Sequence, residues 1–293
     1  MIDVYFDKNV LSHILTVERG RTETNGVTLA DVEKLRAAVA DGQIRNLMSA
    51  VQVQEAAYAL NAPSAAAAKE ELALIRSLLY QEEVILFPPE LLFLNIVNYA
   101  KGDGPPYPLM PNTLDLDGMF SPTGDIAARK QALADTRTQE AAFHAAAANA
   151  NAHDRAIILA EFGNAQPAFE DFYKAKIIAR LRELVQNAES HSGQGGLLAA
   201  CEARGLEGML SFKTLAIASG ASLSYQYARV FTEFSEKKRR REGDPPDLNH
   251  ALLSSAADIL VTHDGDFAFW YGRVPNKGVE VLDHLHKLLA RLT

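Results

Sequence analysis

The sequence has little that could cross-link the chain or hold it in a membrane. Its single cysteine, Cys201, excludes an internal disulfide and a cysteine-based zinc site, so we expect a reducing, cytoplasmic compartment. The most apolar stretch, residues 84–97, is interrupted by Pro88, Pro89 and Glu90 and falls short of the roughly 20 apolar residues of a membrane span. No basic segment followed by a long apolar run opens the chain, so we expect no signal peptide.

Basic residues are fewer than acidic residues. The chain has 29 Lys and Arg against 37 Asp and Glu, a formal net charge of −8, which argues against a protein that coats nucleic acid over its whole surface. A local basic patch is still compatible with this balance. The composition, with 48% hydrophobic and 23% charged residues, is that of a globular chain, and 293 residues predict one large domain or two small ones.

Both ends of the chain alternate short apolar runs with amphipathic segments. The apolar runs predict strands at residues 2–6, 43–48, 83–87, 259–262 and 279–282, and the segments between them predict helices at 9–15, 31–39, 50–60, 69–80, 248–257 and from 283 onward. Strands followed by helices favour parallel pairing through right-handed crossovers. We therefore expect an α/β fold of three layers, a parallel sheet flanked by helices.

The middle of the chain differs from both ends in composition and patterning. Residues 102–124 are rich in Gly and Pro or irregular, residues 126–186 are almost all helix-forming, and residues 197–241 again have helical patterning. This contrast predicts one α/β domain made of residues 1–100 and 245–293, with residues 101–244 as an α-helical insertion.

Acidic residues follow the predicted strands. Asp7 ends the first strand, Asp264 and Asp266 come directly after the strand at 259–262, Glu55 lies in the helix after the second strand, and Asp247 opens the helix at 248–257. The carboxyl ends of parallel strands meet at one edge of a sheet, so we expect these carboxylates to gather there. Clustered carboxylates repel one another and require a hard divalent cation, which predicts a Mg²⁺ or Mn²⁺ site.

Each acid also has an ordinary structural explanation. Asp7 and Asp247 could be helix N-caps, and Asp264 and Asp266 flank Gly265 and could make a turn. Glu55 could be a solvated helix residue, although its neighbours are mostly apolar.

Four segments together resemble the motifs of the PIN domain, a metal-dependent ribonuclease fold. Residues 4–11 resemble its first motif, a hydrophobic strand followed by Asp, and residues 49–55 resemble its second, a Ser six positions before a helical Glu. Residues 247–257 resemble the third motif, an Asp that opens an Ala-rich helix. Residues 259–267 resemble the fourth, a hydrophobic strand, Thr, then Asp and Asp-Phe.

The resemblance assigns roles to particular residues. It implies that the metal-binding and catalytic acids are Asp7, Glu55, Asp247 and Asp264, with Asp266 as an additional or alternative ligand. It implies that Thr262 orients the site by hydrogen bonding. Candidates for supporting contacts around the ligands or to phosphate are Asn9, His250 and His263.

The resemblance implies a Mg²⁺- or Mn²⁺-dependent endoribonuclease in which a metal-bound water attacks the phosphodiester. Members of the family commonly serve as toxins of toxin–antitoxin pairs or in RNA processing, so RNA and an antitoxin or other protein are the expected partners. A basic run before Asp247 is a candidate contact for the nucleic-acid backbone: Lys237, Lys238, Arg239, Arg240 and Arg241. Its ordinary alternative is a solvated helix end.

Two other functions stay open at this point. A non-catalytic module could keep a PIN-like fold and bind a partner protein through the helical insertion. A DNA-directed nuclease or another metal-dependent phosphatase would have the same site chemistry with a different substrate. The insertion could bind RNA, cover the site or form a homo-oligomer interface, and the sequence does not choose among these.

Overall fold

The computed structural model describes most of the chain. The described residues are 1–20, 23–49, 51, 52, 73, 77, 79–111, 156–163, 166–231, 244–275 and 277–292. Among the predicted features, Glu55, the basic run Lys237–Arg241 and most of the predicted helices at 50–60 and 69–80 lie outside them. Asp247 is the fourth residue of a helix that begins at Asp244, so it does not open this helix as expected, and its side chain is not among those described.

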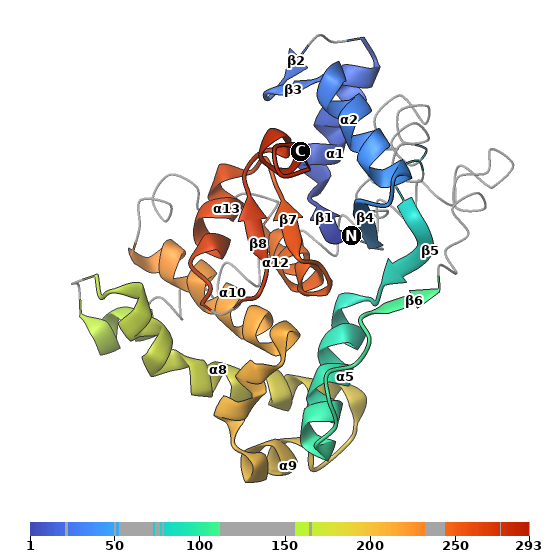
Figure 1. Cartoon of the computed structure of the whole chain (residues 1–293). Helices are drawn as coiled ribbons and strands as arrows, with labels where there is room; N and C mark the ends of the chain where they lie inside the picture. Colours follow the sequence, from blue (N-terminus) through green and yellow to red (C-terminus); the bar gives the residue numbers. More distant parts are fainter. Residues whose placement is uncertain are drawn as a thin grey trace, which may run out of the picture.

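A six-stranded, mostly parallel sheet forms the centre (Figure 1), which confirms the α/β class. Its order is β6-β5-β4-β1-β7-β8, and only β6 runs antiparallel to its neighbour. The strands are β1 (Ile2–Phe6), β4 (Ile44–Ser49), β5 (Leu79–Ile85), β6 (Leu109–Pro111), β7 (Ile259–Val261) and β8 (Glu280–Leu282). A separate small hairpin is formed by β2 (Glu23–Thr24) and β3 (Val27–Thr28).

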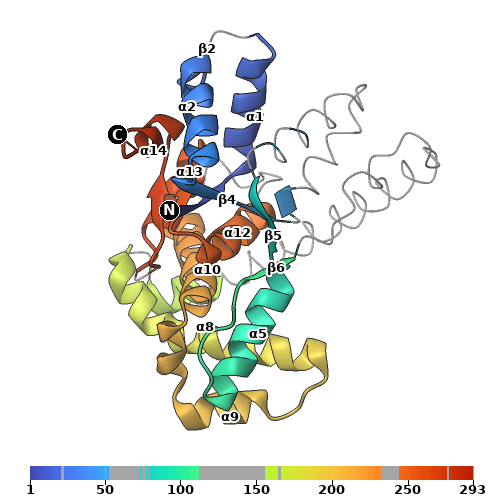
Figure 2. The same cartoon turned by 45° about the vertical axis from the view of Figure 1, so that its right-hand side comes forward.

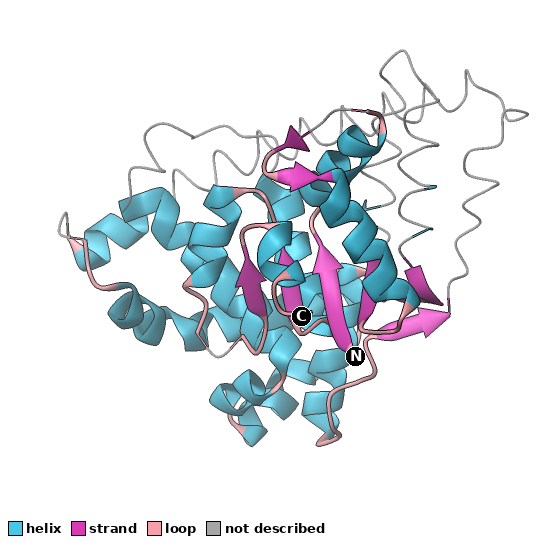
Figure 3. Ribbon diagram, turned by 45° about the horizontal axis from the view of Figure 1, so that its top comes forward, coloured by secondary structure: helices cyan, strands magenta, loops and turns pink. Residues whose placement is uncertain are grey.

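The strands alternate side chains between two buried faces, because successive residues of a strand point to opposite sides. In β1, Val4 and Phe6 face one core, whereas Tyr5 faces the other. The first core is completed by α1 (Lys8–Glu18), α2 (Leu29–Ala40) and α14 (Leu285–Leu289). The second is completed chiefly by α10 (Lys213–Phe231), α12 (Asp244–Leu253) and α13 (Gly265–Gly272). Figures 2 and 3 show the sheet between these helices.

A third core lies beyond the second helical layer. It is formed by α10 together with α5 (Pro88–Lys101), α8 (Phe169–Ser192), α9 (Leu197–Arg204) and the 3₁₀ helix η2 (Leu206–Ser211). Helix α10 therefore belongs to two cores: Ile217 packs toward the sheet, and Leu215 and Leu223 pack toward the outer helices. The predicted boundaries of the α/β domain and the insertion stay a prediction, but α10 ties residues of the middle range to the sheet.

Several elements differ from the sequence-based expectations. Strand β5 begins at Leu79, where we expected a helix to Tyr80, because this segment pairs with β4 through an irregular register. Residues 109–111, expected to be irregular, form the edge strand β6, where proline is tolerated because one side of an edge strand has no pairing partner. The segment after β7, expected to be a loop, contains α13.

None of the helices in the part of the chain that the structure describes is long and apolar enough to cross a membrane.

Candidate functional site

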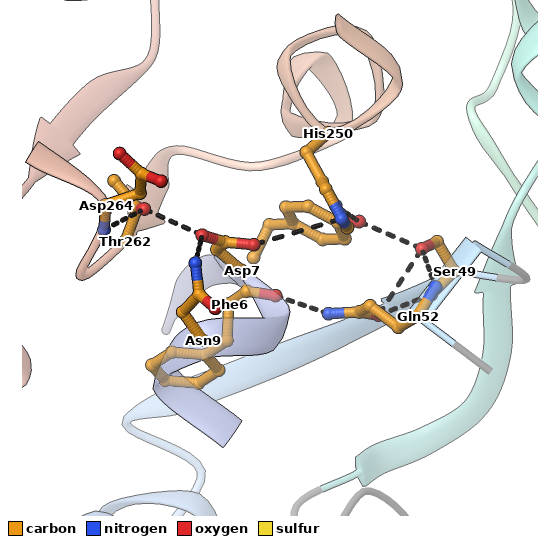
Figure 4. Close-up of polar contacts among 9 residues, drawn as sticks. Phe6, Asp7, Asn9, Ser49, Gln52, His250, Thr262 and Asp264 are labelled. Atoms are coloured by element: carbon orange, nitrogen blue, oxygen red, sulfur yellow. Dashed lines mark hydrogen bonds and ion pairs between the residues drawn. The ribbon is translucent and has the colours of Figure 1, made fainter. Parts of the chain in front are cut away.

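The order in which strands are added to the sheet reverses at β1. From β1 the sheet grows one way through β4 and β5, and later elements return to the other side of β1 as β7 and β8. Open α/β sheets bind ligands outside the carboxyl ends of the strands at such a reversal. Asp7 follows β1, Ser49 ends β4 and Thr262 follows β7, so all three lie at this edge (Figure 4).

Asp7 is the central residue of this edge and is only 4% exposed. It occupies the N-cap position of α1, but its side chain makes no capping hydrogen bond. Its backbone groups connect the end of β1 to β7 and to α1: the N–H donates to Val261 O at 2.9 Å, and the carbonyl accepts from the N–H of Val10 at 3.0 Å. The carboxylate therefore caps no backbone N–H of its own helix, and its shortest side-chain hydrogen bond is to Thr262, after β7.

One oxygen of Asp7 is held from β7. The hydroxyl of Thr262 lies 2.8 Å from Oδ2, and Nδ2 of Asn9 donates to the same oxygen over a long 3.4 Å. Thr262 Oγ1 also accepts the backbone N–H of Asp264 at 3.0 Å. Thr262 thus donates its hydroxyl proton to Asp7, and the backbone N–H of Asp264 holds the hydroxyl oxygen in place.

The other oxygen faces α12. Nε2 of His250 lies 3.8 Å from Asp7 Oδ1, too far for a hydrogen bond, and its Nδ1 lies 2.7 Å from the hydroxyl of Tyr5. The Tyr5 hydroxyl also contacts Ser49 Oγ at 2.9 Å. Tyr5, Ser49 and His250 are at most 1% exposed, so a buried polar chain connects the end of β4 to Asp7.

Ser49 and Gln52 fix the segment that leaves β4. The backbone N–H of Ser49 donates to Gln52 Oε1 at 2.8 Å, and the backbone N–H of Gln52 donates to Ser49 Oγ at 3.3 Å, the reciprocal pattern of a capping box. Nε2 of Gln52 also donates to the carbonyl of Phe6. Gln52 thus joins the start of this segment to the backbone directly before Asp7, and Glu55 comes three residues later in the sequence.

Asp264 has a structural role through one oxygen. Its Oδ1 accepts the backbone N–H groups of Asp266 at 2.8 Å and Phe267 at 3.1 Å, so Asp264 is the N-cap of α13. Within the described chain, Oδ2 of Asp264 has no hydrogen bond. Asp266 lies in the first turn of α13. In Figure 4, Asp264 and Asp7 lie on the two sides of Thr262.

The structure therefore brings together five of the predicted site residues: Asp7, Asn9, His250, Thr262 and Asp264. It also adds Tyr5 and Gln52, for which the sequence predicted no role. Among the side chains that the structure describes, no three His, Cys, Asp or Glu residues form a group that could hold a metal. Two of the four predicted ligands, Glu55 and Asp247, have no described side chain, so the full acidic set stays a prediction.

His263 lies in a different cluster. Its Nε2 accepts the backbone N–H of Leu285 at 3.2 Å, so a neutral ring holds its proton on Nδ1, which faces Nδ1 of His13 at 2.7 Å. The rings of His284 and His286 continue the cluster. Burial, together with the neighbouring histidines, lowers the pKa of His263 to about 4, and burial lowers the pKa of His13 although Asp7 opposes this.

This cluster predicts a loss of stability in mild acid. The unfolded His263 takes up a proton near pH 6.5 and the folded one only near pH 4, so the free energy of unfolding falls as the pH drops between these values. At pH 5 we expect a loss of about 1 kcal/mol from His263, after allowance for its partial exposure. Urea unfolding at pH 7.5 and about pH 5 in EDTA should show this loss for wild type and a smaller one for His263→Gln. His191→Gln, in the exposed end of α8, is the control, and equal losses in all three proteins would contradict the prediction.

Comparisons of the whole chain with family models, curated proteins and solved structures gave no match. The geometry around Asp7 is thus the firmest guide to a function. Its features are a buried carboxylate at the sheet reversal, hydrogen bonds to it from Thr262 and Asn9, and a second acid, Asp264, whose backbone N–H donates to Thr262.

Proposed function

We propose that the protein is a metal-dependent nuclease of the PIN-like kind that hydrolyses phosphodiester bonds of RNA. One observation carries the proposal: a single polar network joins the four segments in which the sequence places an acidic ligand. Asp7 is its centre, and Asp264 joins it through Thr262. Gln52 and His250, which reach Phe6 and Asp7, each stand three positions from a predicted ligand, Glu55 and Asp247.

The spacing of three residues supports a common location for the acids. Positions three apart share one face of a helix, and residues 247–250 lie within α12. His250 lies against Asp7, and Asp247 precedes it by three positions in α12, so we expect Asp247 near the same site. On the segment after β4, Gln52 is helical and Glu55 follows it by the same interval.

The donor set suits a hard divalent cation. Carboxylate oxygens are the ligands that Mg²⁺ and Mn²⁺ prefer, and Asp264 keeps one oxygen outside its capping bonds. Asp7 and Asp264 would hold the ion together with Glu55 and Asp247, with Asp266 close by in sequence. A bound ion of this kind supplies an activated water and neutralises charge on the phosphate.

The residues around Asp7 fix the orientation of its carboxylate and bury it. Thr262 fixes the orientation of the carboxylate by donating a hydrogen bond, and the backbone of Asp264 keeps that hydroxyl in place. The Tyr5–His250 pair fills the other side of Asp7 and excludes water from it, since both side chains are buried. A preformed and dry surrounding of this kind strengthens electrostatic interactions with an ion and with a phosphate.

The proposal includes the expected partners. The substrate is single-stranded or structured RNA, with DNA as the alternative substrate for the same chemistry. The sheet with helices on both faces is compatible with the architecture that the resemblance implies. A toxin role with an antitoxin partner, or a role in RNA processing, follows from the family resemblance alone.

The proposal is tested by cleavage of labelled single-stranded RNA and DNA in Mg²⁺, in Mn²⁺ and in EDTA. We expect cutting of RNA that requires the metal and stops in EDTA, because the carboxylates alone provide no activated water. Cutting of DNA but not RNA would keep the site chemistry and change the substrate. A protein that cuts neither, and whose melting temperature does not respond to Mn²⁺, would contradict the proposal and favour the protein-binding module.

A further inference from the structure

Helix α13 begins at the candidate site and exposes one large aromatic side chain. Phe267, Trp270 and Tyr271 are buried, whereas Phe269 is exposed and Arg273, the C-cap four positions later, is partly exposed. The helix starts directly after Asp264. At 1.5 Å of rise per residue, Phe269 is only about 7.5 Å along the axis from Asp264.

Phe269 is one of the large apolar side chains that remain in solvent, with 52% of its surface exposed. Single exposed apolar residues are ordinary and need no explanation by themselves. What distinguishes Phe269 is its neighbour, because Cζ of the Arg273 guanidinium lies 4.0 Å from the centre of its ring. An exposed aromatic ring and a partly buried guanidinium are thus in cation–π contact.

Arg273 has no acidic partner in the described part of the chain. Its other contact is the Tyr227 ring, at 5.6 Å, and its Nη1 is buried without a hydrogen bond. A guanidinium has five N–H donors, and an unsatisfied buried donor costs free energy. The neighbouring cation, Lys277, has hydrogen-bond acceptors, because it donates to the carbonyls of Gly272 and Val274.

We propose that Phe269 and Arg273 form a stacking platform for a base of a single-stranded nucleic acid whose phosphate lies at the Asp7 site. The inference rests on the proposed function and specifies how the substrate is held. Aromatic rings and arginine planes are the groups on which proteins stack unpaired bases, and such stacking is tolerant of sequence. In a chain of net charge −8, an arginine without an acidic partner beside the site is also well suited to a polyanion.

The platform is tested by fluorescence anisotropy with a labelled RNA of about a dozen nucleotides in EDTA, which separates binding from cutting. A second oligonucleotide of equal length and charge carries abasic residues. We expect wild type to prefer the intact RNA, and Phe269→Ala to weaken binding of that RNA about 5- to 50-fold with little effect on the abasic one. Tyr107→Ala is the matched control, because Tyr107 is an exposed aromatic residue near the far edge strand.

Arg273→Lys separates stacking from charge, because lysine keeps the charge but has no plane. We expect it to reduce the preference for intact RNA while leaving abasic binding near wild type. The platform is overturned if Phe269→Ala binds intact RNA as tightly as wild type, which would leave this face for a protein partner, or if wild type does not prefer intact RNA. If metal-dependent cutting persists in either case, the proposed function stands without the platform. If wild type neither binds nor cuts, both fail.

Discussion

Replacing Asp7 by asparagine is expected to reduce metal-dependent cleavage by more than about 100-fold, because loss of even a supporting contact around a metal ligand typically costs 10- to 100-fold. The substitution removes the charge and keeps the shape. An amide oxygen can still accept the hydrogen bond from Thr262, so the arrangement of β1 and β7 is retained. Initial rates with labelled RNA and Mn²⁺ measure the effect, and thermal unfolding shows whether the fold is intact.

The matched control is Asp171→Asn, which removes an exposed carboxylate from the first turn of α8. It should cut RNA at the wild-type rate. Mn²⁺ should raise the melting temperature of wild type and of the control but not that of Asp7→Asn, since a ligand that binds only the folded state stabilises it. Wild-type cleavage by Asp7→Asn, or cleavage that continues in EDTA, would exclude Asp7 as a ligand of the reaction.

The sequence predicts the central strands well because their signals are local. An apolar run ended by an acid predicts β1, and the run at 259–262 predicts β7. Parallel pairing then brings Asp7 and Thr262 to one edge without further information. Only the structure shows which acids are helix caps: the Asp264 side chain caps a helix, whereas the Asp7 side chain does not.

Other elements have no clear local signal. Helix α13 is apolar on most sides between two glycines, so it has little helical periodicity, and its cap at Asp264 is the one signal that could have identified it. Pro88 and Pro89 directly follow the predicted strand at 83–87 and give no sign of what comes next, since proline can end a strand and also suits the first turn of a helix, and α5 begins there.

The supporting contacts of the site depend on residues far apart in the chain. Tyr5 belongs to an apolar strand, and its hydroxyl gains a role only because Ser49, 44 residues away, and His250, 245 residues away, pack against it. His13 and His263 are separated by 250 residues. No local pattern encodes such pairs. The family resemblance could suggest Thr262, Asn9 and His250 as supporting residues, but the contacts of Tyr5 with Ser49 and His250 could be found only in the structure.

Replacing Trp270 by alanine is expected to lower the free energy of unfolding by about 3 to 5 kcal/mol, the usual cost of removing a buried tryptophan. Trp270 is 1% exposed, and its ring packs against Tyr225 and Phe267 at centroid distances of 5.7 and 5.1 Å. The Tyr225 contact fixes α13 to α10, and Trp270 belongs to the core between these helices and the sheet. Urea unfolding followed by far-ultraviolet circular dichroism measures the loss.

Phe269→Ala provides the control one residue away on the same helix. Because the side chain is half exposed and its main partner is Arg273, its loss should cost less than about 1 kcal/mol. The pair of variants therefore separates the two sides of α13: Trp270→Ala should weaken the fold, and Phe269→Ala should weaken RNA binding in a stable protein. Equal destabilisation by the two variants would mean that Phe269 is a structural residue, and the buried and exposed sides of α13 would then have the same role.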